Sequence, residues 1–194
     1  MENRIGPKIP NVLGTVSRHL DQQRIPCALI GALALGLYGL PRYTSDIDLM
    51  ADGNDWAAIS RTMAQLGFEC FQKTDAFAQF DAEKGILGKV DFMLVATTDG
   101  RDILKRRVMV DDELLGRQPV IQPTDYLILK MMAIANDGRR AIIDEADIES
   151  VIKLWRAGLI PEPLEALDMA RLAGFADRFG MRDLMAKYLD ETHE

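Results

Sequence analysis

A glycine turn followed by an acidic strand pattern most constrains the fold of this chain. Ile30-Gly31-Ala32 is followed, after thirteen residues, by Asp46-Ile47-Asp48-Leu49. The glycine after a short apolar run predicts a strand, a tight turn and a helix. The alternation predicts a second strand, which buries Ile47 and Leu49 and projects both acids from its other face. The Cα atoms of the two acids would lie about 6.6 Å apart, at about 3.3 Å of rise per residue.

A third acid lies in another strand pattern, Lys89-Val90-Asp91-Phe92-Met93. A lone buried carboxylate is costly, so Asp91 needs a partner or a metal ion. Three acids on neighbouring strands would repel one another, and a divalent cation removes that repulsion. Oxygen ligands suit Mg²⁺, and paired metal ions can activate a hydroxyl and neutralise a leaving group. We therefore predict that Asp46, Asp48 and Asp91 hold Mg²⁺ or Mn²⁺ for chemistry on a nucleotide. The alternative for Asp46 and Asp48 alone is a solvated strand face.

The glycine turn itself is a candidate phosphate site. Gly31 lets the backbone approach a ligand closely, and the helix that begins there offers free amides to a triphosphate. The alternative is a plain strand-to-helix turn. Two other phosphate motifs do not fit. Gly31 and Gly36 have the glycine spacing of a Walker loop, but the residue after Gly36 is Leu37, where that loop requires lysine. The glycine spacing does not match the dinucleotide fingerprint either.

Composition excludes several classes of protein. A chain of 194 residues, 48% of them hydrophobic, can build one compact domain or a small domain with an appendage. With only two histidines, it is a poor candidate for zinc chemistry or a histidine triad. Cys27 and Cys70 lie in apolar settings and are predicted to be buried thiols.

Charge and hydropathy restrict the partners. The net charge of −7 argues against general nucleic-acid binding, and the basic clusters at 101–107 and 139–140 are most simply solvated surface. No apolar run reaches the roughly 18 residues of a membrane span, and the first ten residues carry no signal sequence. We expect a cytoplasmic protein without a membrane partner.

Periodicity predicts an α+β fold, with a mixed β-sheet flanked by helices over residues 1–122 and a helical region over 123–194. The segments 77–81 and 89–95 are predicted to form a hairpin. Predicted strands cover 25–30, 45–51, 68–71, 77–81, 89–95, 108–110 and 119–121. Predicted helices cover 8–22, 32–37, 56–66, 99–107, 124–136, 141–157, 161–175 and 180–190.

These motifs resemble the signature of polymerase-β-type nucleotidyltransferases. That signature is a hydrophobic residue, glycine and a second small residue, then nine to thirteen residues, then acid-hydrophobic-acid-hydrophobic, with a third acid on a later strand. The run from Ala34 to Asp48 resembles the minimal bacterial AbiEii-like group, whose members often occur in toxin–antitoxin or abortive-infection systems. The resemblance covers roughly residues 27–50, 88–95 and 124–150, and its third block is the weakest.

The resemblance implies roles for the acids and the turn. Asp46, Asp48 and Asp91 would be metal ligands, and Asp91 could also accept the proton of the acceptor hydroxyl. Gly31 and Ala32 would place the β- and γ-phosphates. Ala32 departs from the usual glycine or serine, so it offers a phosphate only its backbone amide.

The resemblance also implies roles outside the acidic strands. Arg42 and Thr44 would steady the loop before the first acid or touch the substrate. Lys130 would contact phosphate, unless it is a helix lysine that covers apolar neighbours. Arg140 and Asp144 would match residues of the family's helical half. Because they are four residues apart, the alternative is that the pair simply stabilises a helix.

Two functions of different classes follow. The first is an enzyme that moves a nucleoside monophosphate from a nucleoside triphosphate to a hydroxyl of a protein, tRNA or small molecule. The second is a catalytically silent binding or regulatory protein of the same fold, similar to an antitoxin. An unrelated α/β protein with coincidental acids is the third reading, and its acids would point apart.

Overall fold

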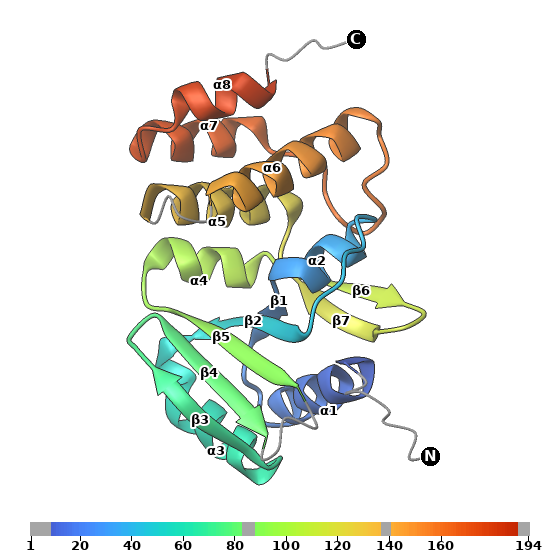
Figure 1. The fold of residues 1–194 in the computed structure, drawn as a ribbon, viewed down its shortest axis with the longest axis vertical. Helices are drawn as coiled ribbons and strands as arrows, with labels where there is room; N and C mark the ends of the chain where they lie inside the picture. Colours follow the sequence, from blue (N-terminus) through green and yellow to red (C-terminus); the bar gives the residue numbers. More distant parts are fainter. Residues whose placement is uncertain (1–8, 83–87, 137–140, 190–194) are drawn as a thin grey trace. The chain divides into compact units, whose positions relative to one another are not determined.

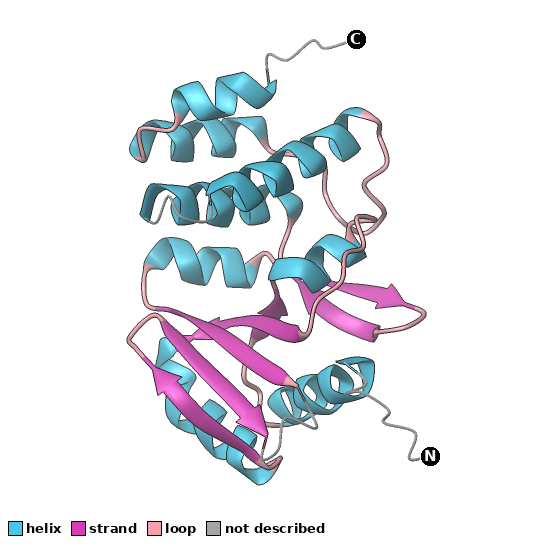
Figure 2. Cartoon of the chain, viewed as in Figure 1, coloured by secondary structure: helices cyan, strands magenta, loops and turns pink. Residues whose placement is uncertain are grey.

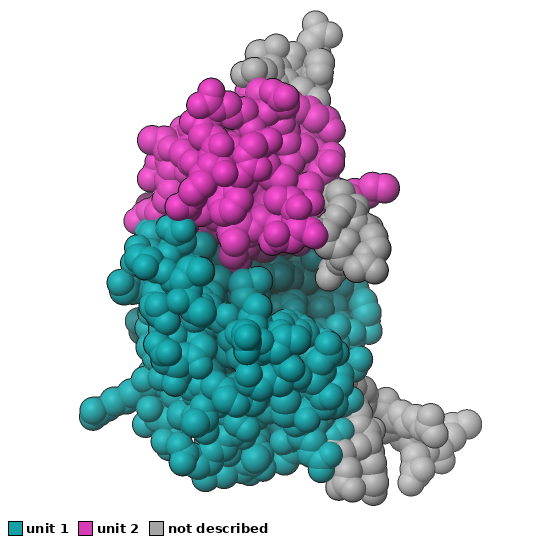
Figure 3. Space-filling view, turned by 90° about the vertical axis from the view of Figure 1, so that its left-hand side faces the viewer, with its two compact units in different colours: residues 1–37, 41–121 teal, residues 38–40, 122–194 magenta. Residues whose placement is uncertain are grey.

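The computed structural model describes residues 9–82, 88–136 and 141–189, and the chain divides into two compact units (Figures 1 and 3). Unit 1 holds residues 1–37 and 41–121, and unit 2 holds residues 38–40 and 122–194. The strands belong to unit 1, and unit 2 is built from helices (Figure 2).

Unit 1 is a mixed β-sheet with helices on both faces. Its strands within the described residues are β1 (Cys27–Leu29), β2 (Asp46–Asp52), β3 (Phe68–Lys73), β4 (Phe77–Ala82), β5 (Lys89–Val95), β6 (Val108–Asp112) and β7 (Gly116–Val120). Their order is β3-β4-β5-β2-β1-β7-β6, in which β2 with β5 and β1 with β7 are parallel and the other neighbours are antiparallel. The predicted α+β class, mixed sheet and β4–β5 hairpin are confirmed.

The helices of unit 1 lie in two pairs, one pair on each face of the sheet (Figure 1). They are α1 (Ile9–Gln22), α2 (Gly31–Leu37), α3 (Trp56–Gln65) and α4 (Thr98–Lys105), with a 3₁₀ turn η1 (Gly53–Asp55) before α3. Helices α1 and α3 lie on one side of the sheet, where Trp56 contacts Phe80 at 5.9 Å between ring centroids. Helices α2 and α4 lie on the other side, where Arg101 of α4 binds Asp52 of β2 at 2.7 Å.

Alternation along the strands explains this arrangement. Ile47 and Leu49 of β2 and Phe92 of β5 are almost completely buried, whereas Asp46 and Asp48 are half-buried. Successive side chains on a strand point to opposite faces, so the apolar residues form the core on the α1–α3 side. The acids therefore project from the opposite face of the sheet.

The described part of unit 2 consists mainly of the helices α5 (Pro123–Asn136), α6 (Ala141–Arg156), α7 (Met169–Arg178) and α8 (Arg182–Leu189). In its core, Tyr38 meets Tyr126 edge to face at 5.7 Å between centroids. The predicted helix over 161–175 is wrong in its first half, because α7 begins at Met169. Prolines 161 and 163 disfavour a helix there, and Asp168 caps α7 by accepting from Arg171 N at 2.9 Å.

The second correction concerns a cysteine. Both cysteines are free thiols, and Cys27 is buried as predicted, but Cys70 is exposed. It lies on β3, an edge strand of the sheet that buries only its first residue, Phe68. The apolar sequence around Cys70 therefore marks an open edge and not a buried strand. No helix in the described part of the chain is long and apolar enough to cross a membrane.

Candidate active site

The three predicted acids lie on one face of two adjacent strands. Strands β2 and β5 pair in parallel, with Asp48 directly opposite Asp91 and Asp46 directly opposite Lys89. Directly opposed residues share a face, and Asp46 shares it with Asp48 because they are two residues apart. Neighbouring strands are about 4.8 Å apart. The structure thus brings Asp46, Asp48 and Asp91 to one patch of the sheet, as the sequence predicts.

Gly31 packs against the carboxylate of Asp48. Its φ is +62°, and a Cβ atom added to it would lie 2.2 Å from Asp48 Oδ2 and 2.8 Å from Cγ. The adjacent amide of Ile30 donates to the carbonyl of Asp48 at 3.0 Å. Only glycine can take this backbone conformation without strain and leave this space for the carboxylate. Ala32, the next residue, is buried in α2, so its methyl group is part of the core.

Asp91 is anchored through one oxygen only. Gln79 of β4, directly opposite Asp91, donates from Nε2 to Oδ2 at 3.1 Å. The other oxygen, Oδ1, is buried and has no hydrogen-bond partner among the residues that the structure describes. Burial raises the pKa of the Asp91 carboxyl and the charge of Asp46 raises it further, while the Gln79 hydrogen bond and Lys89 lower it. A buried carboxylate oxygen without a partner is costly and is completed by a cation or a donor.

Thr44 organises the backbone where β2 begins. Its hydroxyl donates to the carbonyl of Asp46 at 3.1 Å and accepts from the amide of Asp46 at 3.2 Å. The Ser45 hydroxyl donates to Asp46 Oδ1 at 3.2 Å. Arg42, two residues earlier, is exposed in the same loop. These contacts favour a steadying role for Thr44, and substrate contact by either residue stays a prediction.

The acids fit a metal ion in kind but are not gathered around one point. Among the described residues, no three histidine, cysteine, aspartate or glutamate side chains form a group that could hold a metal ion. The unpartnered Oδ1 of Asp91 and the oxygen-only donor set match the preferences of Mg²⁺ or Mn²⁺.

Lys130 lies in unit 2, where two carboxylates engage it. Its ammonium is 2.7 Å from Asp144 and 2.7 Å from Asp147, and it lies over the ring of Tyr126. Asp147 also accepts a hydrogen bond from the Tyr126 hydroxyl at 3.0 Å. Asp144 thus contacts Lys130, while the predicted pairing of Asp144 with Arg140 lies outside the described residues. The phosphate contact of Lys130 stays a prediction.

Three residues on the acidic face were not singled out from the sequence. Gln79 binds Asp91, Lys89 lies opposite Asp46, and Asp81 lies opposite Lys89 with a buried Oδ1 that has no partner. The signal was present in β4, where polar residues alternate with Ala78, Phe80 and Ala82. Aligning this alternation across the predicted hairpin would have placed Gln79 beside Asp91.

No family model and no curated protein sequence matches the chain. Solved structures do match. The ANT(2″)-Ia complex with adenylyl-2″-tobramycin matches with a TM-score of 0.65 and 11% identity over 88% of this chain and 98% of that chain. A nucleotidyltransferase-like protein from Paracoccidioides brasiliensis matches with a TM-score of 0.57 and 17% identity, over 94% of this chain and 92% of that chain. The chain has a nucleotidyltransferase fold. The lincomycin-bound lincosamide adenylyltransferase LnuA also matches, with a TM-score of 0.52 and 12% identity, over 73% of this chain and 96% of that chain.

Proposed function

We propose that this protein is a nucleotidyltransferase that uses Mg²⁺ or Mn²⁺ to move a nucleoside monophosphate from a nucleoside triphosphate to an acceptor hydroxyl. One observation carries the proposal: Asp46, Asp48 and Asp91 share one face of the parallel β2–β5 pair, with the Gly31 backbone against the Asp48 carboxylate. Residues 1–122 would form the catalytic domain and residues 123–194 a helical region.

In this proposal each acid has a distinct part. Asp46 and Asp48 would hold the cation together with Asp91, and a bound cation would supply charge neutralisation at the phosphates and activation of the hydroxyl. The acceptor oxygen forms a bond to the α-phosphorus, the bond from that phosphorus to the bridging oxygen of the β-phosphate breaks, and pyrophosphate leaves. Asp91 takes the hydroxyl proton. Gly31 and the Ala32 amide bind phosphate, helped by Arg42 and Thr44, and Lys130 of unit 2 is a separate candidate for a phosphate contact.

Two similar structures suggest a first set of acceptors to test. One contains an adenylylated tobramycin and the other contains lincomycin. We therefore propose a small polyhydroxylated acceptor, with a protein or tRNA hydroxyl as further candidates. Membership of the AbiEii-like group, with a cytoplasmic role in a toxin–antitoxin pair, is the corresponding cellular proposal.

A second candidate is a catalytically silent protein of the same fold. The observation that favours it is the alanine at position 32, which has no hydroxyl for phosphate. Such a protein would bind a nucleotide or a partner without turnover. A metal titration separates the candidates, because a working site gathers its acids around the cation.

The proposal is tested by incubating the protein with Mg²⁺ or Mn²⁺ and each α-labelled nucleoside triphosphate. Aminoglycosides, lincosamides, tRNA and cell extract serve as separate acceptors. Label transfer that is lost in Asp46→Asn and kept in Asp75→Asn supports the enzyme, because Asp75 is an exposed acid outside the acidic face. Nucleotide binding without transfer to any acceptor supports the silent protein.

A further inference from the structure

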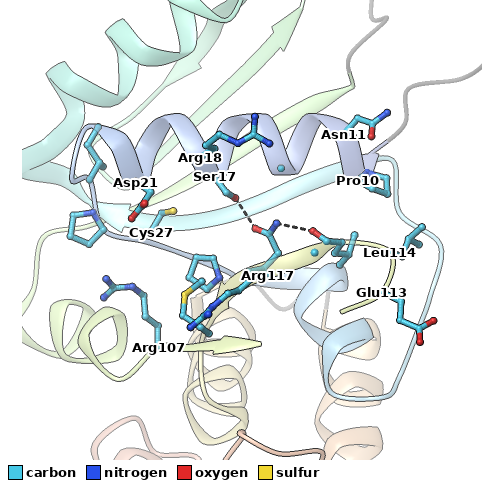
Figure 4. Close-up of a pocket in the computed structure, with 18 of the residues that line it drawn as sticks. Pro10, Asn11, Ser17, Arg18, Asp21, Cys27, Arg107, Glu113, Leu114 and Arg117 are labelled. Carbon is cyan, nitrogen blue, oxygen red and sulfur yellow. Dashed lines mark hydrogen bonds between the residues drawn. The ribbon is translucent and has the colours of Figure 1, made fainter. Parts of the chain in front are cut away.

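A pocket lies in unit 1 between helix α1 and the β6–β7 hairpin (Figure 4). Its volume is about 770 Å³, within the range of roughly 300–1,000 Å³ typical of small-molecule sites. Arg18 and Asp21 reach it from α1, and Arg107 and Arg117 from the hairpin side (Figure 4).

This pocket is separate from the acidic face. Cys27, which lines it, pairs with Ala51 of β2. Ala51 is an odd number of residues from Asp46 and from Asp48, so it projects from the opposite face of the strand. The ligand of this pocket would therefore not compete with a nucleotide held by the acids.

The lining carries an excess of positive charge. Four arginines, Arg18, Arg24, Arg107 and Arg117, stand against two acids, Asp21 and Glu113, in a chain whose net charge is −7. Arg107 donates to a backbone carbonyl at 2.8 Å. The guanidinium groups of the other three make no hydrogen bond or ion pair within the described part of the chain. Unpaired guanidinium groups around a concave site attract multiply charged oxyanions.

Arg24 adds an independent observation, because its backbone is strained. Its φ of +56° makes it the one residue other than glycine with positive φ among the described residues. It follows the end of α1, a position where glycine avoids the strain. The strained backbone thus carries a long cationic side chain at the pocket, at a position where glycine would carry none.

The other walls are suited to an uncharged group. Pro10, Met109, Leu114 and Pro119 line the pocket, while the buried Gln118 amide is already bonded to Ser17 and to a backbone carbonyl. We propose that the α1–hairpin pocket binds a small molecule that carries a polyphosphate group, with the arginines on the phosphates and the apolar walls beside its organic part.

Cys27 allows the pocket to be monitored directly. It is 5% exposed, and burial raises the pKa of its thiol to about 11, so its reaction with the neutral reagent 4,4′-dithiodipyridine at pH 9 will be slow and sensitive to occupancy. The Cys70→Ser substitution removes the exposed thiol. The experiment uses metal-free buffer and tripolyphosphate, ATP or citrate, so that its result does not depend on metal-assisted binding at the acids.

We expect tripolyphosphate or ATP, but not citrate, to slow the reaction of Cys27 at least threefold. In calorimetry, Arg24→Gly and Arg117→Gln should each weaken binding about tenfold, whereas Arg61→Gln on the exposed side of α3 should leave it within twofold. Arg24→Gly should also leave the melting temperature unchanged or raise it, which separates binding from folding. Absence of protection at millimolar ligand, equal protection by citrate, or undiminished binding in both pocket variants would overturn the proposal.

Discussion

The contact between Gly31 and Asp48 makes a quantitative prediction for Gly31→Ala. The added Cβ would lie 2.2 Å from Asp48 Oδ2, whereas an ordinary contact needs at least 3.4 Å, so the carboxylate must move by about 1 Å. Misplacing a catalytic group by about 1 Å can lower the rate about 100-fold. The left-handed backbone conformation adds about 1 kcal/mol of strain to any residue with a side chain.

Gly67→Ala is the matched control. Gly67 also has a positive φ, of +83°, but nothing lies within 4 Å of its added Cβ. The backbone conformation alone should cost each variant about 1 kcal/mol of stability, or about 2–4 °C in melting temperature for a chain of this size, and Gly31→Ala should lose at least this much because its Cβ also displaces Asp48. Only Gly31→Ala should lose kcat/KM, by about 100-fold or more, in an assay of pyrophosphate release with the acceptor found by label transfer.

Unchanged kcat/KM in Gly31→Ala would refute the reasoning, because it would show that the Asp48 carboxylate can leave its place without cost. An equal loss of kcat/KM in Gly67→Ala would assign the effect to general destabilisation. The melting curves distinguish a displaced carboxylate from a misfolded chain, since the first leaves the cooperative transition intact.

Three further predictions concern other contacts. Gln79→Met removes the donor that holds Asp91 Oδ2 and should lower kcat about tenfold, while Gln65→Met at the exposed end of α3 leaves kcat unchanged. Because burial raises the folded-state pKa of Asp91, its ionisation opposes folding above the ordinary carboxyl pKa. Asp91→Asn should therefore raise the melting temperature at pH 7, and the gain should shrink as the pH falls to 3.5. Lys130→Met leaves two buried carboxylates uncompensated and should cost about 3–5 kcal/mol in urea unfolding, whereas Lys153→Met, in an exposed pair, should cost under about 1 kcal/mol.

The sequence alone could predict which side chains of a strand lie on its polar face, but it could not predict which strands pair with one another. Alternation in β2 and β5 is local, so Asp46, Asp48 and Asp91 could each be assigned to a polar face from the sequence alone. Which strands pair depends on packing between segments about 40 residues apart, and no local pattern encodes it. For the same reason Gln79, whose importance comes from its pairing with Asp91, could be found only once the hairpin was aligned.

Local rules failed where tertiary packing or chain stiffness overrode them. Leu164 and Leu167 have the spacing of a helix and are buried, yet they belong to an irregular segment that begins with two prolines. The pairing of Lys130 with Asp144 and Asp147 depends on helices α5 and α6 packing together, which periodicity within either helix cannot specify.

The parallel pairing of β2 with β5 also bears on when the acidic patch can arise as the chain folds. The β4–β5 hairpin is local and can form early, whereas Asp48 meets Asp91 only after a loop of about 40 residues has closed. That closure brings like charges together, so it must be driven by the burial of Ile47, Leu49 and Phe92 on the other face. A nascent or partly unfolded chain would therefore lack the assembled acids, and activity would report on completed folding.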